Sequence, residues 1–235
     1  MNWLSESAKK GRKLKDMFNL SGVDVFIKDM TPEHIDDEFV FDYISARIPF
    51  HLSRGIDVIY VGLFPEMIDR EINAYYEDGA IYVTNNQDDE MDMIDDIIHE
   101  LAHAVEVNNQ QFIYGSGMLQ REFKAKRRNL YTLIQEMYDV PNNFLSDIEY
   151  NRQIDDFNYY KNQFKFDNFL YKTIGYDILN QMVANIFVSG YAATSVSEYF
   201  ARGFEEYFIG DKDSLQKMSP VLYKIIDRLV HMEDE

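Results

Sequence analysis

Two histidines and a glutamate stand at a spacing that could hold a catalytic metal ion. The stretch IIHELAHAVE, residues 97–106, contains His99, Glu100 and His103. Residues four apart share one face of an α-helix, about 6 Å apart along its axis, so the two imidazoles can converge on one ion. Glu100 flanks that ion and can take a proton from a water molecule whose pKa zinc lowers to about 7. The spacing predicts a hydrolytic zinc site with Glu100 as the general base.

The same pattern has a purely structural interpretation, in which His99 and His103 only pack or cap within a helical protein. HExxH recurs by chance, so the surrounding residues must support the metal site. The chain has only five histidines, and two of them frame this glutamate. Apolar residues at helical spacing could bury one face of the segment: Ile94, Ile97, Ile98, Leu101, Ala102 and Val105. This context favours the zinc site.

A catalytic zinc needs a third protein ligand. The chain has no cysteine, which leaves histidine and carboxylates. Glu106 shares the helix face, but it is seven residues from His99, about 10 Å along the axis. It is better placed to accept a hydrogen bond from a ligand than to bind the ion itself. His34 and His51 precede much of the expected sheet and His231 is near the C-terminus, so we expect a carboxylate from a later helix.

The stretch GYAATSVSEYFARGFEEYF, residues 190–208, contains one such carboxylate. Ser197 can cap a helix that has Glu198 in its first turn. Aromatic residues would pack that helix into a core: Tyr199, Phe200, Phe204, Tyr207 and Phe208. Because the chain has 41 acidic residues, the residues alone leave Glu198 as one candidate among several.

The elements that would position these residues are a small sheet followed by helices. Strands are expected at 23–27 and 56–64, and a hairpin turns at Asp78-Gly79 within 72–85. A helix is expected over 31–48, with Thr31 as its cap and proline at its first position. From about residue 90 the pattern is helical, with segments near 91–107, 118–138, 155–172, 176–189, 197–208 and 219–231.

The predicted fold class is α+β, with a small mixed sheet packed on the active-site helix and a mostly helical C-terminal lobe. We expect a single domain over 1–235, with the sheet and active-site helix in about 1–107 and the lobe in about 108–235. The hairpin strand 79–85 is predicted to be the sheet edge facing the cleft, where an extended peptide could pair with it. Tyr82 on that strand is interpreted as a packing residue.

Two motifs together resemble a known family. HELAH, then Tyr191, Glu198 seven residues later and Tyr-Phe-Ala after it, look like the catalytic domain of anthrax lethal factor and are similar to the clostridial Pro-Pro endopeptidases. The resemblance implies a zincin-like fold and zinc on His99, His103 and Glu198. It also implies that Glu100 is the base and that the Tyr191 hydroxyl assists at the scissile carbonyl. From the residues alone, Tyr191 could instead be an ordinary packing aromatic near the start of a helix, because the chain has 17 tyrosines.

The resemblance covers about residues 80–208, and the chain departs from the family pattern in two places. The family often has an acidic residue four positions after the third ligand, where this chain has Arg202. Glu198 follows His103 by 95 positions, and the segment between them is expected to contain extra helices over 118–172. The family's substrate specificity therefore does not transfer.

Composition limits the partners of the protein. A net charge of −18 argues against nucleic acid. It could attract a basic protein or peptide substrate, or it could only keep the protein in solution. The chain has no apolar run of about 18 residues, the length that would suggest a membrane span. The N-terminus has no apolar signal region, so we expect synthesis in the cytoplasm, with later delivery outside the cell or within a particle left open.

The sequence thus predicts a zinc metalloendopeptidase, a hydrolase that cleaves peptide bonds with a metal-activated water. The alternative is a catalytically silent zincin-like protein that serves as a structural or binding component of a larger assembly. The presence of Glu100 argues against this alternative, because a silent scaffold has no need for the base.

Overall fold

The structure is a computed structural model that describes residues 17–20, 22–137 and 169–232. These residues belong to two compact units. The first unit contains the chain up to Gln110 together with the chain from Asp227 onward, and the second runs from Gln111 to Ile226.

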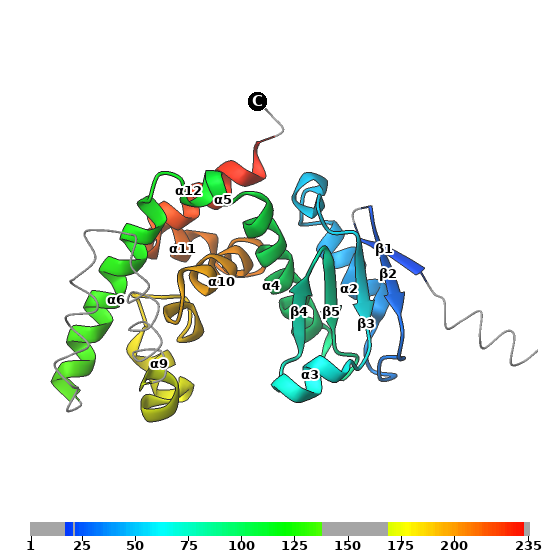
Figure 1. The fold of residues 1–235 in the computed structure, drawn as a ribbon, viewed down its shortest axis with the longest axis horizontal. Coiled ribbons are helices and arrows are strands. Elements are labelled where there is room, and N and C mark those ends of the chain that lie inside the picture. Colours follow the sequence, from blue (N-terminus) through cyan, green and yellow to red (C-terminus); the bar gives the residue numbers. More distant parts are fainter. Residues whose placement is uncertain (1–16, 21, 138–168, 233–235) are drawn as a thin grey trace, which may run out of the picture. The chain divides into compact units, whose positions relative to one another are not determined.

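The first unit is built on a mixed five-stranded sheet (Figure 1). Its strands are β1 (Met17–Leu20), β2 (Val23–Ile27), β3 (Val58–Val61), β4 (Ala74–Glu77) and β5 (Ala80–Val83). Their order in the sheet is β1-β2-β3-β5-β4, with parallel pairing from β2 through β3 to β5 and antiparallel pairing of β1 and β4 to their neighbours. The predicted strand at 23–27 is confirmed, the one at 56–64 is confirmed over its middle, and β1 was not predicted.

The predicted hairpin is confirmed, but its place in the sheet differs from the prediction. Asp78 and Gly79 have φ values of 46° and 85°, the paired positive values of a tight hairpin turn. β5 then pairs with β4 on one side and β3 on the other. The prediction that strand 79–85 is the sheet edge is therefore wrong. Ile81 and Val83 are fully buried on β5, which suits a central strand, and the described edge strand on this side is β4.

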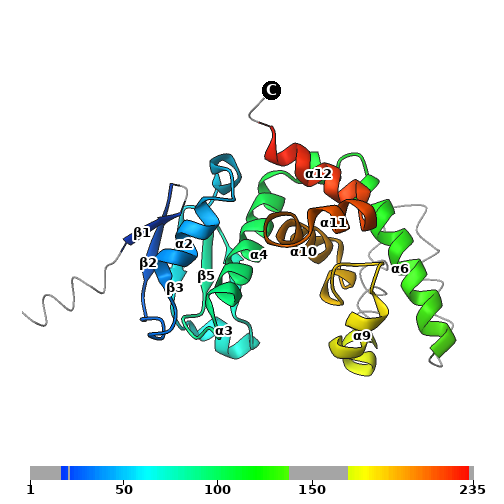
Figure 2. The same ribbon diagram turned by 180° about the vertical axis from the view of Figure 1, so that it is seen from behind.

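The two faces of the sheet differ in character. Figures 1 and 2 show α2 (Asp37–Ser45) and α4 (Glu90–Asn108) against one face, which carries buried aliphatic residues. The opposite face carries a row of aromatic rings from Phe26 through Tyr60 and Tyr82 to Tyr75, with successive centroids 5.9, 5.4 and 4.6 Å apart. Tyr82 is thus a packing residue, as predicted.

Helix α2 begins later than the sequence indicates. The predicted helix over 31–48 is confirmed only for Asp37–Ser45. Asp36 is the actual N-cap, because its side chain accepts a hydrogen bond from the amide of Phe39. Thr31 instead donates its hydroxyl to the carboxylate of Asp37. The short helices α3 (Pro65–Arg70) and η1 (Phe50–Ser53) complete this unit.

The described part of the second unit is built from helices. They are α5 (Gln110–Tyr114), α6 (Met118–Met137), η2 (Leu170–Ile174), α9 (Tyr176–Met182), η3 (Tyr191–Ala193), α10 (Val196–Ile209), α11 (Lys212–Met218) and α12 (Pro220–Val230). By chain position, α5 begins and α12 ends in residues assigned to the first unit. The described part of the chain contains no helix of the length and apolar character that a membrane crossing would need.

Most predicted helices are confirmed to within about two residues, namely those near 91–107, 118–138, 197–208 and 219–231. The helix predicted over 176–189 ends at Met182, and Asn185 has a left-handed φ of 68° soon after it. The helix predicted over 155–172 lies mostly outside the described residues. Helix α11 was not predicted. Its N-cap is Asp211, whose side chain accepts hydrogen bonds from the amides of Asp213 and Ser214. The fold is α+β, as predicted.

Candidate metal centre

Helix α4 carries the two histidines and is fixed at its N-terminus by a cap. The Asp89 carboxylate accepts hydrogen bonds from the amides of Met91 and Asp92, at 2.8 and 3.0 Å. The apolar face of the helix is buried through Ile94, Ile97, Ile98, Leu101, Ala102 and Val105. His99 and His103 lie on a different, half-buried face one turn apart, so the burial of the apolar face sets the direction in which both imidazoles point.

The geometry of the two imidazoles suits a shared metal ion. Nε2 of His99 and Nε2 of His103 are 3.2 Å apart, and the rings are nearly perpendicular at 82°. Zinc–nitrogen bonds of about 2.0–2.1 Å at a tetrahedral angle would place two ligand nitrogens about 3.3–3.4 Å apart. The observed separation therefore matches two ligands of one tetrahedral ion.

Glu106 lies behind His103, as the sequence predicts. Its Oε2 is 3.3 Å from Nδ1 of His103, and the two side chains are 13% and 20% exposed, respectively. A hydrogen on Nδ1 that is donated to this carboxylate leaves the lone pair of Nε2 available to a metal. Glu106 therefore orients His103 and sets its tautomer.

Replacing Glu106 by alanine is expected to lower zinc affinity by about 10–100-fold without abolishing binding. The side chain holds the ring of His103 in place but is not itself a ligand in this assignment. Competition with a chelator measures the loss, and peptidase activity should fall only partly at saturating zinc. A greater loss of zinc from this variant than from Glu198→Ala would show that Glu106 is the third ligand.

The candidate base Glu100 lies between the histidines in sequence and is 9% exposed. One turn earlier on α4, the carboxylate of Asp96 accepts a hydrogen bond from the side-chain nitrogen Nε2 of Gln87 at 3.0 Å. The same nitrogen donates to the carbonyl of Thr84. Burial raises the pKa of Asp96 to about 6, and the Gln87 hydrogen bond acts in the opposite direction. Gln87 thus links the end of β5 to the helix that carries His99.

Asp96→Asn is expected to stabilise the metal-free protein by about 2 kcal/mol at pH 7. Because the pKa of Asp96 is raised from 3.8 to about 6 in the folded protein, the folded state binds this proton more tightly than the unfolded chain does. The wild type is therefore destabilised as the pH rises through this range and Asp96 loses its proton. Asparagine keeps an acceptor for Gln87 and carries no charge. Chemical denaturation at pH 7 and at pH 3.5 measures the effect. The variant should be more stable than the wild type at pH 7 but not at pH 3.5. Equal stability of the two proteins at pH 7 would contradict this prediction.

Helix α10 supplies the predicted carboxylate. Its N-cap is Ser195, whose hydroxyl oxygen accepts a hydrogen bond from the amide of Glu198 at 3.0 Å. The prediction of Ser197 as the cap is therefore wrong by two residues. Ser195 has the extended backbone of a cap, whereas Ser197 already lies within the helix. Glu198 remains in the first turn, as expected.

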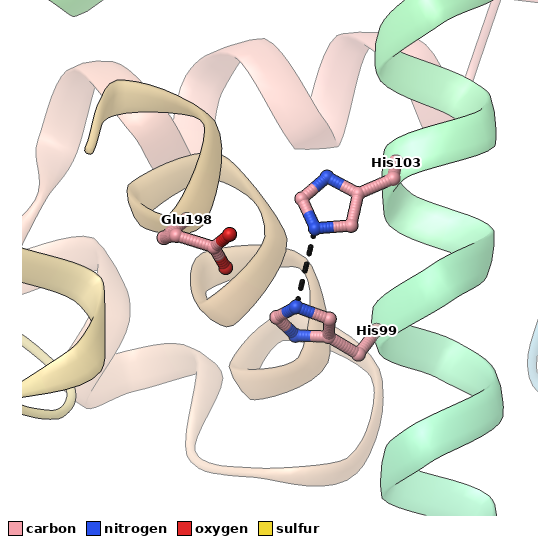
Figure 3. Close-up of side chains that lie close together, drawn as sticks. All are labelled: His99, His103 and Glu198. Atoms are coloured by element: carbon pink, nitrogen blue, oxygen red, sulfur yellow. Dashed lines mark hydrogen bonds between the residues drawn. The ribbon is translucent and has the colours of Figure 1, made fainter. Parts of the chain in front are cut away.

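The three predicted ligands have donor atoms close together. One nitrogen from each of His99 and His103 and one carboxylate oxygen of Glu198 all lie within 4.8 Å of one another (Figure 3). Among the residues that the structure describes, no other set of three or more histidine, cysteine, aspartate or glutamate side chains meets this condition. These three residues could therefore hold a metal ion.

The remaining histidines take other roles, as expected. Nε2 of His51 lies 2.8 Å from the carbonyl of Leu229, and Nδ1 of His231 lies 2.7 Å from the carbonyl of Asp227. His34 is exposed. All three lie outside the metal-binding group.

Tyr191 and Arg202 are the two other positions that the family resemblance singles out. Tyr191 lies in η3, which packs on α10, and its side chain is 41% exposed with its ring edge-to-face with Tyr176. Its role at the scissile carbonyl remains a prediction. Arg202 forms an ion pair with the buried carboxylate of Glu205 at 2.6 Å.

Asp96 and Gln87 were not singled out from the sequence. The available signal was the spacing of four residues from Asp96 to Glu100, which places both on one side of α4.

Comparison of the chain with protein-family models, curated proteins and solved structures finds no match.

Proposed function

We propose that this protein is a zinc-dependent metalloendopeptidase with a zincin-like fold, related in its active site to anthrax lethal factor. The observation that carries the proposal is the group of donor atoms from His99, His103 and Glu198 within 4.8 Å of one another. The motif spacing supports it independently, because HExxH places a general base beside two ligands of the same helix.

The donor set fits zinc. Two imidazole nitrogens and one carboxylate oxygen form the ligand set of several zinc hydrolases, which leave a fourth position open for water or substrate. The absence of cysteine from the chain makes a thiolate site impossible, and borderline metals such as zinc accept this mixture of nitrogen and oxygen. When bound, zinc would lower the pKa of a water molecule and polarise a peptide carbonyl.

The residues of the chain would divide the work of hydrolysis. His99, His103 and Glu198 hold the metal, and Glu106 keeps the hydrogen of His103 on Nδ1. A carboxylate oxygen of Glu100 takes a proton from the attacking water and delivers it to the nitrogen of the leaving amine. The hydroxyl of Tyr191 donates a hydrogen bond to the oxyanion that forms at the carbonyl.

The proposed substrate is a protein or peptide, with basic sequences favoured. The net charge of −18 supports this preference, because a strongly acidic protein attracts cationic partners over long range. That attraction weakens as salt screens it, so the rate of cleavage of basic peptides should fall with ionic strength.

Cleavage of a diverse peptide library by the zinc-loaded protein tests the proposed function. Mass spectrometry of the products should reveal internal cuts that disappear with a zinc chelator and return when zinc is added. Zinc binding without cleavage of any library member or protein substrate would favour the catalytically silent alternative. Cleavage that persists without metal would contradict the proposal.

A further inference from the structure

The first turn of α10 has to be held firmly if Glu198 is to serve as a ligand. A ligand must sit within about 0.5 Å of its productive position, and its neighbours must keep it there. The Ser195 cap holds the amide of Glu198, but this bond lies within α10 and does not anchor the helix to its surroundings. The anchors come from α6, within the same compact unit.

Arg127 on α6 holds the chain immediately before the cap. Its Nη1 donates to the carbonyl of Thr194 at 2.8 Å, and the residue is 4% exposed. Thr194 directly precedes Ser195 and is four residues before Glu198. A hydrogen bond from a buried charged group is among the stronger ones, since its donor has been withdrawn from water. Arg127 thus fixes the point at which the chain enters α10.

Glu122 on α6 holds the residue that follows Glu198. The hydroxyl of Tyr199 donates to Oε1 of Glu122 at 2.9 Å, and Tyr199 is fully buried. A tyrosine hydroxyl has one hydrogen to donate and an ionised carboxylate can only accept, so Tyr199 is the donor and Glu122 the acceptor of this bond.

The Glu122 carboxylate is itself firmly fixed. Its Oε1 also accepts the amide of Leu222 at 3.0 Å, and its Oε2 accepts the amide of Val221 at 2.8 Å. These amides belong to the first turn of α12, whose N–H groups have no acceptor within the helix. One turn along α6, the buried amine of Lys126 donates to the carbonyls of Ile186 and Met218. Glu122 therefore offers Tyr199 a rigid acceptor.

We propose that Arg127 and Glu122 are positioning residues for Glu198. Arg127 holds the chain before Glu198 through the carbonyl of Thr194, and Glu122 holds the chain after it through the hydroxyl of Tyr199. The inference rests on the proposed role of Glu198 as a zinc ligand. Neither α6 residue contacts the metal in this assignment. Their effect is to restrict the rotation and sliding of the first turn of α10, and so to keep the carboxylate ready for the ion before the ion binds.

The test compares Tyr199→Phe and Arg127→Met with wild type and with a matched control. Tyr199→Phe removes only the hydroxyl that reaches Glu122. Tyr131→Phe is the control, because Tyr131 is a fully buried tyrosine on α6 and loses the same group. Arg127→Lys should restore part of what Arg127→Met loses. Zinc affinity is measured by chelator competition, the visible spectrum of the cobalt-loaded protein reports ligand geometry, and thermal unfolding of the metal-free protein reports stability.

Tyr199→Phe and Arg127→Met should each weaken zinc binding by about tenfold or more and alter the cobalt bands, whereas Tyr131→Phe should change neither. Loss of thermal stability with zinc affinity within about twofold of wild type and an unchanged cobalt spectrum would overturn the positioning role. That result would leave the metal centre intact. A wild-type protein that binds no stoichiometric zinc would instead overturn the metal centre, and the positioning role with it.

Discussion

Glu198→Ala should lose stoichiometric zinc and all peptidase activity. In the proposed centre this residue is one of three protein ligands and the only anionic one, so its removal leaves two imidazoles 3.2 Å apart to hold the ion. The loss of affinity should exceed the 10–100-fold range of an indirect effect. Metal analysis after dialysis and chelator competition measure it directly.

Glu206→Ala is a suitable control for Glu198→Ala. It removes a carboxylate from the same helix two turns later, where Glu206 accepts a hydrogen bond from the amide of Asp211. This variant should bind zinc as the wild type does. If Glu198→Ala kept one zinc per chain with unchanged affinity, another residue would be the third ligand and the resemblance to lethal factor would fail.

Glu100→Gln should reduce peptidase activity by at least about a hundredfold, the usual scale for loss of a positioned base. Glutamine keeps the size of the buried side chain but cannot accept the proton of the attacking water. Zinc content should stay at one per chain, because Glu100 is not a ligand in the proposed centre. Steady-state kinetics on a cleaved peptide, together with metal analysis, separates the two effects.

Asp95→Asn is the matched control for Glu100→Gln, since it neutralises another carboxylate of α4. Its activity should remain close to that of the wild type. Full activity in Glu100→Gln would mean that a different group takes the proton, and the assignment of the base would be wrong.

Local sequence signals predicted most of the elements but not their arrangement. Asp78-Gly79 specified a hairpin because both residues tolerate positive φ, which the turn requires. The pairing of β5 with β3 joins segments separated by more than a dozen residues, and nothing local to strand 79–85 encodes it. The prediction that this strand lies at the sheet edge was wrong for this reason. The N-caps were predicted two to five residues away from their actual positions. Thr31 and Ser197 are also capping residue types, but Asp36 and Ser195 have the extended backbone that a cap requires.

The candidate centre was predictable where its residues share a helix. His99, Glu100, His103 and Glu106 follow one another at helical spacing, and the contact of Glu106 with His103 follows from that spacing. The prediction of Glu198 as the third ligand depended on the family resemblance, because the local sequence does not distinguish it from the other candidates among 41 acidic residues. The hydrogen bonds that Arg127 and Glu122 form could not be predicted, since their partners lie 67 to 100 residues away along the chain.

Anomalous diffraction at the zinc absorption edge, from crystals of the zinc-loaded protein, tests the central claim most directly. The metal centre predicts a single strong peak at about 2.0–2.2 Å from Nε2 of His99, Nε2 of His103 and a carboxylate oxygen of Glu198. A peak at another group of residues, or no peak in crystals grown with stoichiometric zinc, would contradict it.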